Sequence, residues 1–201
     1  MNKIESIYDN DPAIFAKSYL TYLSETLDNI STEDIAKFIR TILDARERGA
    51  TIFFMGNGGS AATASHFAND LAIGTCSYHK PFRALALTDN NSILTAIAND
   101  FGYDDVFERQ LRVLGKEGDL VVGISASGNS NNLLRAFSVA KDLRIKTIAL
   151  TAFDGGRMLK EADESIHVKT GIGEYGPAED SHMILDHLVG AYLLQLVKRG
   201  G

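Results

Sequence analysis

The sequence has little cysteine and proline, no tryptophan, and fewer positive than negative charges. Its single cysteine, Cys76, excludes a disulfide within the chain, and no cysteine cluster suggests a structural zinc site. The three prolines mark no linker between domains. The 20 Lys and Arg residues are outnumbered by 26 Asp and Glu residues, so the formal net charge is −6. This balance argues against nucleic acid as a primary ligand, because binding a phosphate backbone requires a basic face.

Long apolar runs are also missing. None approaches the roughly 20 residues that a helix needs to span a membrane. The first residues, MNKIESIYDNDP, bear carboxylates where a signal peptide would be basic and then apolar. A lone cysteine suits a reducing compartment. We therefore expect a cytoplasmic protein with no membrane partner.

Residues 1–50 are expected to form a pair of amphipathic helices. Apolar residues recur close to every 3.6 positions, at Ile14, Phe15, Tyr19, Leu20, Leu23 and Leu27, and again at Ile35, Phe38, Ile39, Ile42 and Leu43. The second helix is expected to stop at Gly49. Two helices without strands cannot enclose a core, so they must pack on the rest of the chain or on another copy of it. We predict an N-terminal oligomerisation segment.

From residue 51 onward, short apolar runs alternate with helical patterns. The predicted strands are Thr51–Met55, Arg83–Leu87, Leu120–Ser125, Lys146–Thr151 and Ser165–Val168. The predicted helices are approximately Ser60–Leu71, Asn91–Asn99, Asp105–Val113, Asn131–Leu143, Gly155–Glu161 and Glu179–Lys198. This alternation indicates an α/β fold, in which a doubly wound parallel sheet is covered on both faces by helices. Ligands of such folds bind at the carboxyl ends of the strands.

A glycine-rich turn links the first predicted strand to its helix within FFMGNGGSAATASHFANDL. The turn Gly56-Asn57-Gly58-Gly59-Ser60 lets the backbone approach a ligand closely, and the helix that follows directs unpaired N–H groups at it. Such a helix start favours phosphate. Further along, His66 and Asp70 are four residues apart and so share one face of the helix.

A serine-rich loop, Gly123 to Ser130 (GISASGNS), follows the third predicted strand. Its hydroxyls and N–H groups precede another helix and form a phosphate cradle that needs no Lys or Arg. One such loop is compatible with ordinary turn and capping chemistry. Two of them at the carboxyl ends of strands in one sheet favour a phosphorylated ligand.

The order of these motifs resembles a known family. GNGGS, HFANDL, NDFGYDDVF (Asn99 to Phe107), SASGNS and LTAFDGG (Leu150 to Gly156) resemble the sugar isomerase (SIS) fold, and within it the sedoheptulose 7-phosphate isomerases, or phosphoheptose isomerases. The resemblance implies a three-layer αβα fold with a five-stranded parallel sheet, and a homotetramer joined by N-terminal helices. It also implies conversion of sedoheptulose 7-phosphate to D-glycero-D-manno-heptose 7-phosphate, the first step of bacterial heptose biosynthesis.

The resemblance further implies a set of site residues. One Zn²⁺ would be bound by His66 and Asp70 from the first helix of the sheet domain, and by Glu179 and His187 from the last helix. Asp70 and His187 would be the catalytic acid and base. The implied contacts with the substrate are Asn57, Gly58, Gly59, Ser60, Asp89, Asn99, Asp100, Ser125, Ala126, Ser127, Ser130 and Glu179.

Some assignments stay open in the sequence. Asp180 lies seven residues before His187 and aligns with it slightly better than Glu179 does, so either acid is a candidate ligand. His182 lies on another side of the predicted helix and is expected to be structural. His79 and His167 lack a partner at ligand spacing, and surface or loop roles are expected for them.

The chain also departs from the family pattern. Asp70 is shorter than the usual Glu, Glu179 replaces a neutral Gln, and Gly74 stands where relatives have an Arg. Ala126 replaces a Thr in the phosphate loop, and GIGEYGPAED lacks an expected Asp-Arg pair. These changes are compatible with a divergent subgroup or with a different phosphosugar.

Two other functions are compatible with the same fold. LTAIAND (Leu94 to Asp100) resembles the DnaA initiator-associating protein, a tetrameric scaffold, as much as it resembles the isomerases. A phosphosugar-binding SIS module would keep the serines and lose the acid and base. The presence of His66, Asp70 and His187 favours the isomerase.

Overall fold

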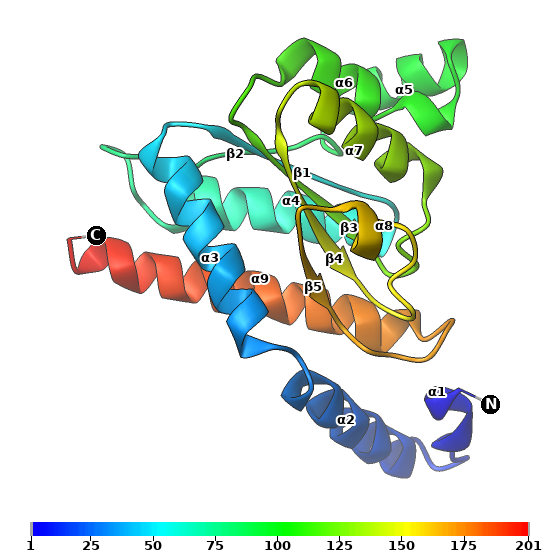
Figure 1. The fold of residues 1–201 in the computed structure, drawn as a ribbon. Helices are drawn as coiled ribbons and strands as arrows, with labels where there is room; N and C mark the ends of the chain where they lie inside the picture. The colour runs from blue at the N-terminus through cyan, green and yellow to red at the C-terminus, as the bar shows by residue number, and fades with distance from the viewer. Residues whose placement is uncertain (1, 201) are drawn as a thin grey trace.

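Five strands form one parallel sheet in the computed structural model, which describes residues 2–200. Its strands are β1 Thr51–Gly56, β2 Arg83–Ala86, β3 Leu120–Ser125, β4 Lys146–Thr151 and β5 Glu164–His167. They lie in the order β2-β1-β3-β4-β5, and each neighbouring pair is parallel. The predicted α/β class and the five-stranded parallel sheet are confirmed (Figure 1).

The sheet separates two hydrophobic cores because alternate side chains of a strand point to opposite faces. In β1, Ile52 and Phe54 enter one core, whereas Phe53 and Met55 enter the other. All six residues of β3 are buried, as expected for a central strand covered on both sides. Helices α3 Thr32–Glu47, α4 Gly59–Asn69 and α9 Tyr175–Lys198 contribute to the first core. Helices α6 Glu108–Leu114 and α7 Asn131–Asp142 contribute to the second (Figure 1).

The remaining elements are shorter or peripheral. They are α1 Lys3–Ser6, α2 Pro12–Asp28, α5 Asn91–Asp100, α8 Met158–Glu161, the π-helical turn η1 Asp70–Gly74 and the 3-10 turn η2 Tyr103–Asp105. The start predicted for α8 was three residues early, because Gly155 and Gly156 have positive φ angles and cannot begin an α-helix. None of the helices described is long and apolar enough to cross a membrane.

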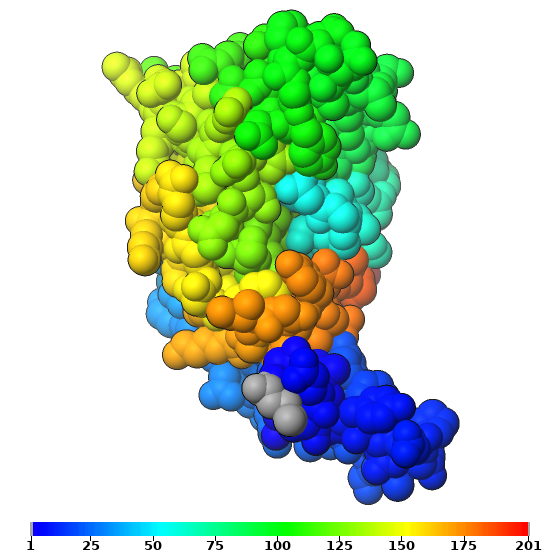
Figure 2. Space-filling view, turned by 90° about the vertical axis from the view of Figure 1, so that its right-hand side faces the viewer, coloured from blue at the N-terminus to red at the C-terminus, as the bar shows by residue number. Residues whose placement is uncertain are grey.

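The N-terminal helices α1 and α2 lie at one end of the molecule, outside the layers around the sheet (Figures 1 and 2). Two hydroxyls of α2 anchor this segment. The Tyr22 hydroxyl donates to the buried Glu174 carboxylate at 2.5 Å, and the Tyr19 hydroxyl donates to Asp180 at 2.5 Å. Ile14 and Leu20 of α2 remain exposed. The segment therefore rests on the N-terminal end of α9, from its N-cap Glu174 to Asp180, while keeping exposed apolar residues.

Candidate functional site

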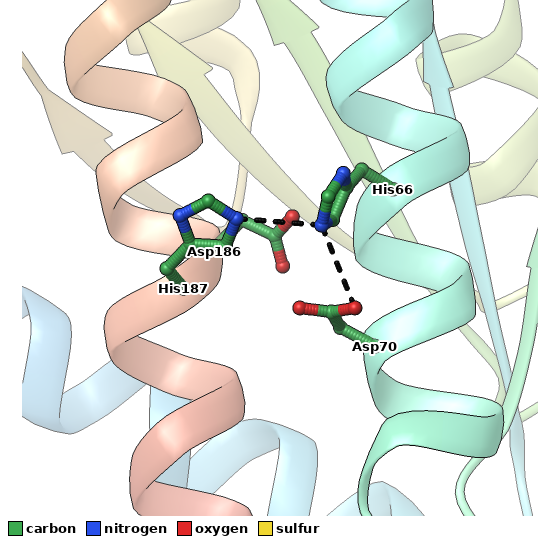
Figure 3. Close-up of side chains that lie close together, drawn as sticks. All are labelled: His66, Asp70, Asp186 and His187. Carbon is green, nitrogen blue, oxygen red and sulfur yellow. Dashed lines mark hydrogen bonds and ion pairs between the residues drawn. The ribbon is translucent and has the colours of Figure 1, made fainter.

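The site is built on α4 and α9, which lie side by side on the same face of the sheet (Figures 1 and 3). Helix α4 begins in the glycine-rich turn directly after β1, and α9 begins after the loop that follows β5. Both helices therefore start near the edge of the sheet where the parallel strands end. Their side chains face one another over several turns.

Four side chains from α4, from the π-helical turn η1 that continues it, and from α9 converge in a cluster formed by His66, Asp70, Asp186 and His187, hereafter the His/Asp cluster (Figure 3). The Nε2 atoms of His66 and His187 are 3.3 Å apart, and His66 Nε2 is 3.5 Å from Asp70 Oδ1. One ligand atom from each of the four residues lies within 4.8 Å of all the others. The predicted convergence of His66, Asp70 and His187 is thus present in a single chain.

Asp186 has an unusual environment within the His/Asp cluster. Its exposed fraction is 0%, and neither carboxylate oxygen has a hydrogen-bond partner among the described residues. Burial, and then the negative charge of Asp70, raises the pKa of Asp186 from 3.8 to about 7. Buried polar groups are normally satisfied, so a buried carboxylate with two unpaired oxygens indicates a missing partner.

The residues of the cluster fit a divalent cation. Zinc binds imidazole nitrogen and carboxylate oxygen at about 2.0–2.2 Å, which places the ligand atoms of a tetrahedral site about 3.3–3.6 Å apart. The two separations measured from His66 Nε2, 3.3 and 3.5 Å, lie in that range. Two carboxylates and two neutral imidazoles also balance a charge of +2.

The glycine-rich turn and the serine loop line one cavity of about 220 Å³, hereafter the serine cavity. Its lining residues are Asn57, Ser60, Ile124, Ser125, Ala126, Ser127, Ser130, Tyr175 and Glu179. Helices α4 and α7 both begin at this cavity, and neither start has a side-chain cap within the described part of the chain. Their first N–H groups are therefore available to an anion, as predicted for phosphate.

Local contacts shape the serine cavity. Asn57 and Asn132 exchange two amide hydrogen bonds at 2.9 and 3.0 Å, and the Tyr103 hydroxyl donates to Asn57 Oδ1 at 2.9 Å. Gly128 has φ +62°, and a Cβ there would collide with the carbonyl of Gly155. The turn between Ser125 and α7 thus requires glycine at this position.

The structure separates some of the predicted substrate contacts from the serine cavity. Asp89 does not line it, and instead accepts a hydrogen bond from the Ser65 hydroxyl beside β2. Asn99 and Asp100 are exposed at the end of α5, where the Asn99 amide donates to Asp100 at 2.8 Å. These three residues therefore do not join the cavity within one chain.

The fourth member of the His/Asp cluster differs from the predicted one. Glu179 lines the serine cavity and is not part of the cluster, whereas Asp180 is hydrogen-bonded to Tyr19 of α2. Sequence reasoning missed Asp186 because only spacings of four, seven and eight residues were considered. The sequence feature that could have identified Asp186 is an acidic residue among the positions of α9 that face the core, between Leu185 and Val189.

The other histidines lie away from the cluster. His182 is fully buried, with Nε2 3.3 Å from the carbonyl oxygen of Thr151, and burial lowers its pKa to about 4. His167 lies 3.1 Å from the Thr151 hydroxyl through Nδ1, and His79 is exposed. None of the three belongs to the cluster.

Comparison with known proteins adds independent evidence. The SIS domain family matches residues 15–152. The probable phosphoheptose isomerase of Thermoplasma acidophilum is 39% identical over 178 residues, covering 89% of this chain and 97% of that protein. The phosphoheptose isomerase of Akkermansia muciniphila is 42% identical over 157 residues, covering 78% of this chain and 82% of that protein.

Solved structures give the same result. The phosphoheptose isomerase of Neisseria gonorrhoeae matches with a TM-score of 0.78 and 34% identity, covering 90% of this chain and 95% of the other. That of Francisella tularensis matches with a TM-score of 0.81 and 28% identity, covering 90% and 96%. These relatives favour the isomerase over the scaffold and the non-catalytic binding module.

Proposed function

The chain belongs to the SIS-domain family as a sugar-phosphate isomerase of the phosphoheptose isomerase group, and we propose that it converts sedoheptulose 7-phosphate to D-glycero-D-manno-heptose 7-phosphate. One observation carries this proposal. The serine cavity and the His/Asp cluster lie on the same two helices, with the anion-binding end at the helix starts and the imidazoles further along. An extended phosphosugar fits such an arrangement end to end.

The spacing between the two ends supports a long substrate. Ser60 and His66 are six residues apart on α4, which corresponds to about 9 Å of helix rise. Glu179 and His187 are eight residues apart on α9, which corresponds to about 12 Å. The phosphate would be bound at the helix starts by Ser60, Ser125, Ser127 and Ser130, leaving the carbonyl end near the cluster.

The cluster offers the groups that an aldose–ketose isomerisation needs. A base must remove a proton from the carbon beside the carbonyl, and an acid must return a proton to the neighbouring carbon. We assign these roles to Asp70, whose side chain is 25% exposed, and to His187, which is exposed on the facing helix. Both side chains point into the region between the two helices (Figure 3).

We propose zinc as the cofactor, bound by His66, Asp70 and His187 together with a fourth group. When bound, such an ion would polarise the sugar carbonyl and stabilise the negative charge of the ene-diolate. The residues of the serine cavity would have other tasks. The serines bind the phosphate, and Glu179, which lines the same cavity, faces the sugar chain.

The assembly is proposed to be a cytoplasmic homotetramer joined through α1 and α2. The exposed apolar residues Ile14 and Leu20 on α2 support an interface there. Leu188 and Tyr192 of α9 are also exposed apolar residues.

The function is tested by incubating the zinc-loaded protein with sedoheptulose 7-phosphate and detecting the aldose by chromatography. We expect accumulation of the aldose up to an equilibrium mixture, and the same mixture from the opposite direction. Ketose phosphates of five and six carbons serve as matched controls of chain length. Turnover of one of these controls, with none of the seven-carbon sugar, would refute the proposed substrate.

A further inference from the structure

We propose that Asp186, and not Glu179, is the fourth ligand of the divalent cation bound by His66, Asp70 and His187. This inference deepens the proposed function, because it concerns the cation assigned there. It differs from the ligand set that the family resemblance implies, in which Glu179 has this role. Two histidines and two aspartates would then form the complete site.

Burial is the first argument. Asp186 is entirely inaccessible to solvent, and both of its carboxylate oxygens are unpaired among residues 2–200. A buried carboxylate needs a hydrogen-bond donor, a positive charge or a metal ion. One carboxylate oxygen of Asp186 and one ligand atom each of His66, Asp70 and His187 all lie within 4.8 Å of one another. A cation among these four atoms would supply the missing partner.

Direction is the second argument. Asp186 and His187 are consecutive on α9, and consecutive helical side chains point about 100° apart. Asp186 therefore reaches the cluster from the protein core, whereas His187 reaches it from the surface. His66 of α4 and Asp70 of η1, the turn that continues α4, approach from the opposite side (Figure 3). Ligands from three directions can surround an ion, as a tetrahedral site requires.

The position of Glu179 is the third argument. It is partly exposed, so water can solvate its carboxylate without a cation. It packs over Gly59 at the start of α4, where a Cβ would collide with it. Joining the cluster would draw it away from this contact and leave Asp186 unpaired. Glu179 is better placed to contact a sugar hydroxyl in the serine cavity.

The proposal is tested by measuring cation binding in the absence of substrate. The full-length protein is stripped of metal with a chelator and titrated with Zn²⁺ by calorimetry, and Co²⁺ binding is followed by visible absorption. The variants Asp186→Asn and Glu179→Gln form a matched pair, because each replaces a carboxylate of α9 by its isosteric amide. Circular dichroism of the metal-free proteins reports whether they are folded.

We expect Asp186→Asn to weaken Zn²⁺ binding by more than about 100-fold, beyond the loss of about 10–100-fold that is typical when only a partner of a ligand is changed. Its Co²⁺ bands should change in position and intensity. Glu179→Gln should bind Zn²⁺ within about threefold of the wild type and keep the Co²⁺ spectrum. If Asp186→Asn does not fold, Asp186→Leu, which fills the buried site without charge, is used in its place.

Three results would overturn the proposal. They are wild-type affinity in the Asp186 variant, a large loss of affinity in Glu179→Gln, and absence of Zn²⁺ binding by the wild type. Each is measured without the sugar, so a protein that binds zinc through Asp186 but does not isomerise sedoheptulose 7-phosphate would contradict the proposed substrate alone.

Discussion

Replacing His182 by glutamine should make the stability of the protein less sensitive to acid. His182 is fully buried, and burial lowers its pKa from 6.5 to about 4. The folded state therefore holds this imidazole neutral, whereas the unfolded state binds a proton once the pH falls below 6.5. As a result, protonation of this residue does not reduce the free energy of unfolding above pH 6.5, but it reduces that free energy progressively as the pH falls from 6.5 towards 4.

The size of this effect follows from the two pKa values. At about 1.36 kcal/mol per pH unit, the interval from 6.5 to about 4 corresponds to a total loss of roughly 3 kcal/mol. Most of this, about 2 kcal/mol, is lost by pH 5. A glutamine at position 182 does not titrate, and its amide can donate to the Thr151 carbonyl that now lies 3.3 Å from Nε2.

The assay is urea unfolding followed by circular dichroism at pH 7.5 and pH 5, with a chelator present and at one protein concentration. Between the two pH values, the free energy of unfolding should fall by about 2 kcal/mol less in His182→Gln than in the wild type. His79→Gln, which changes an exposed histidine, is the control and should behave as the wild type. Equal losses in His182→Gln and the wild type would show that His182 does not titrate as a buried group, which would refute this reasoning.

Three further changes probe the proposed site. His187→Ala should abolish isomerisation while leaving the circular dichroism spectrum unchanged, and retained turnover would remove this imidazole from the mechanism. Ser125→Ala combined with Ser127→Ala should raise KM at least about tenfold through loss of phosphate contacts, with a smaller change in kcat, and an unchanged KM would place the phosphate elsewhere. Gly59→Ala should displace the flexible Glu179 carboxylate, so we expect altered kinetics with unfolding free energy within about 1 kcal/mol of the wild type; unaltered kinetics would show that the position of Glu179 is unimportant.

The sequence predicted the strands well because each is a short apolar run bounded by turn residues. The ends of β3 and β4 were predicted without error. The start of α9 was placed four residues late, since Gly176 and Pro177 resemble a loop. Proline is tolerated in the first turn of a helix, where its missing N–H has no intrahelical partner, so the helix includes it.

The site was predicted only in part, for a geometric reason. His66 and Asp70 are four residues apart on one helix, and this spacing alone predicts that they share a face. The rotation of α9 about its own axis relative to α4 decides which of its residues contact His66 and Asp70. The spacing of residues within one helix does not determine this rotation. The adjacent acid Asp186 was therefore missed, and Glu179 was assigned by resemblance. The predicted contacts Asp89, Asn99 and Asp100 likewise depend on tertiary arrangement rather than on the order of the motifs.

The common direction of α4 and α9 has a consequence for selectivity. Under the proposed function, the phosphate is bound where α4 and α7 begin, and the reacting carbons lie beside groups further along α4 and α9, so helical rise sets much of the distance between the phosphate and the reactive carbon. This geometry would select substrates by chain length. If the phosphate of a sugar one carbon shorter were bound at the same place, its carbonyl carbon would not reach the imidazoles of His66 and His187. An insertion within α4 or α9 would change this distance, and it would also rotate every group beyond it.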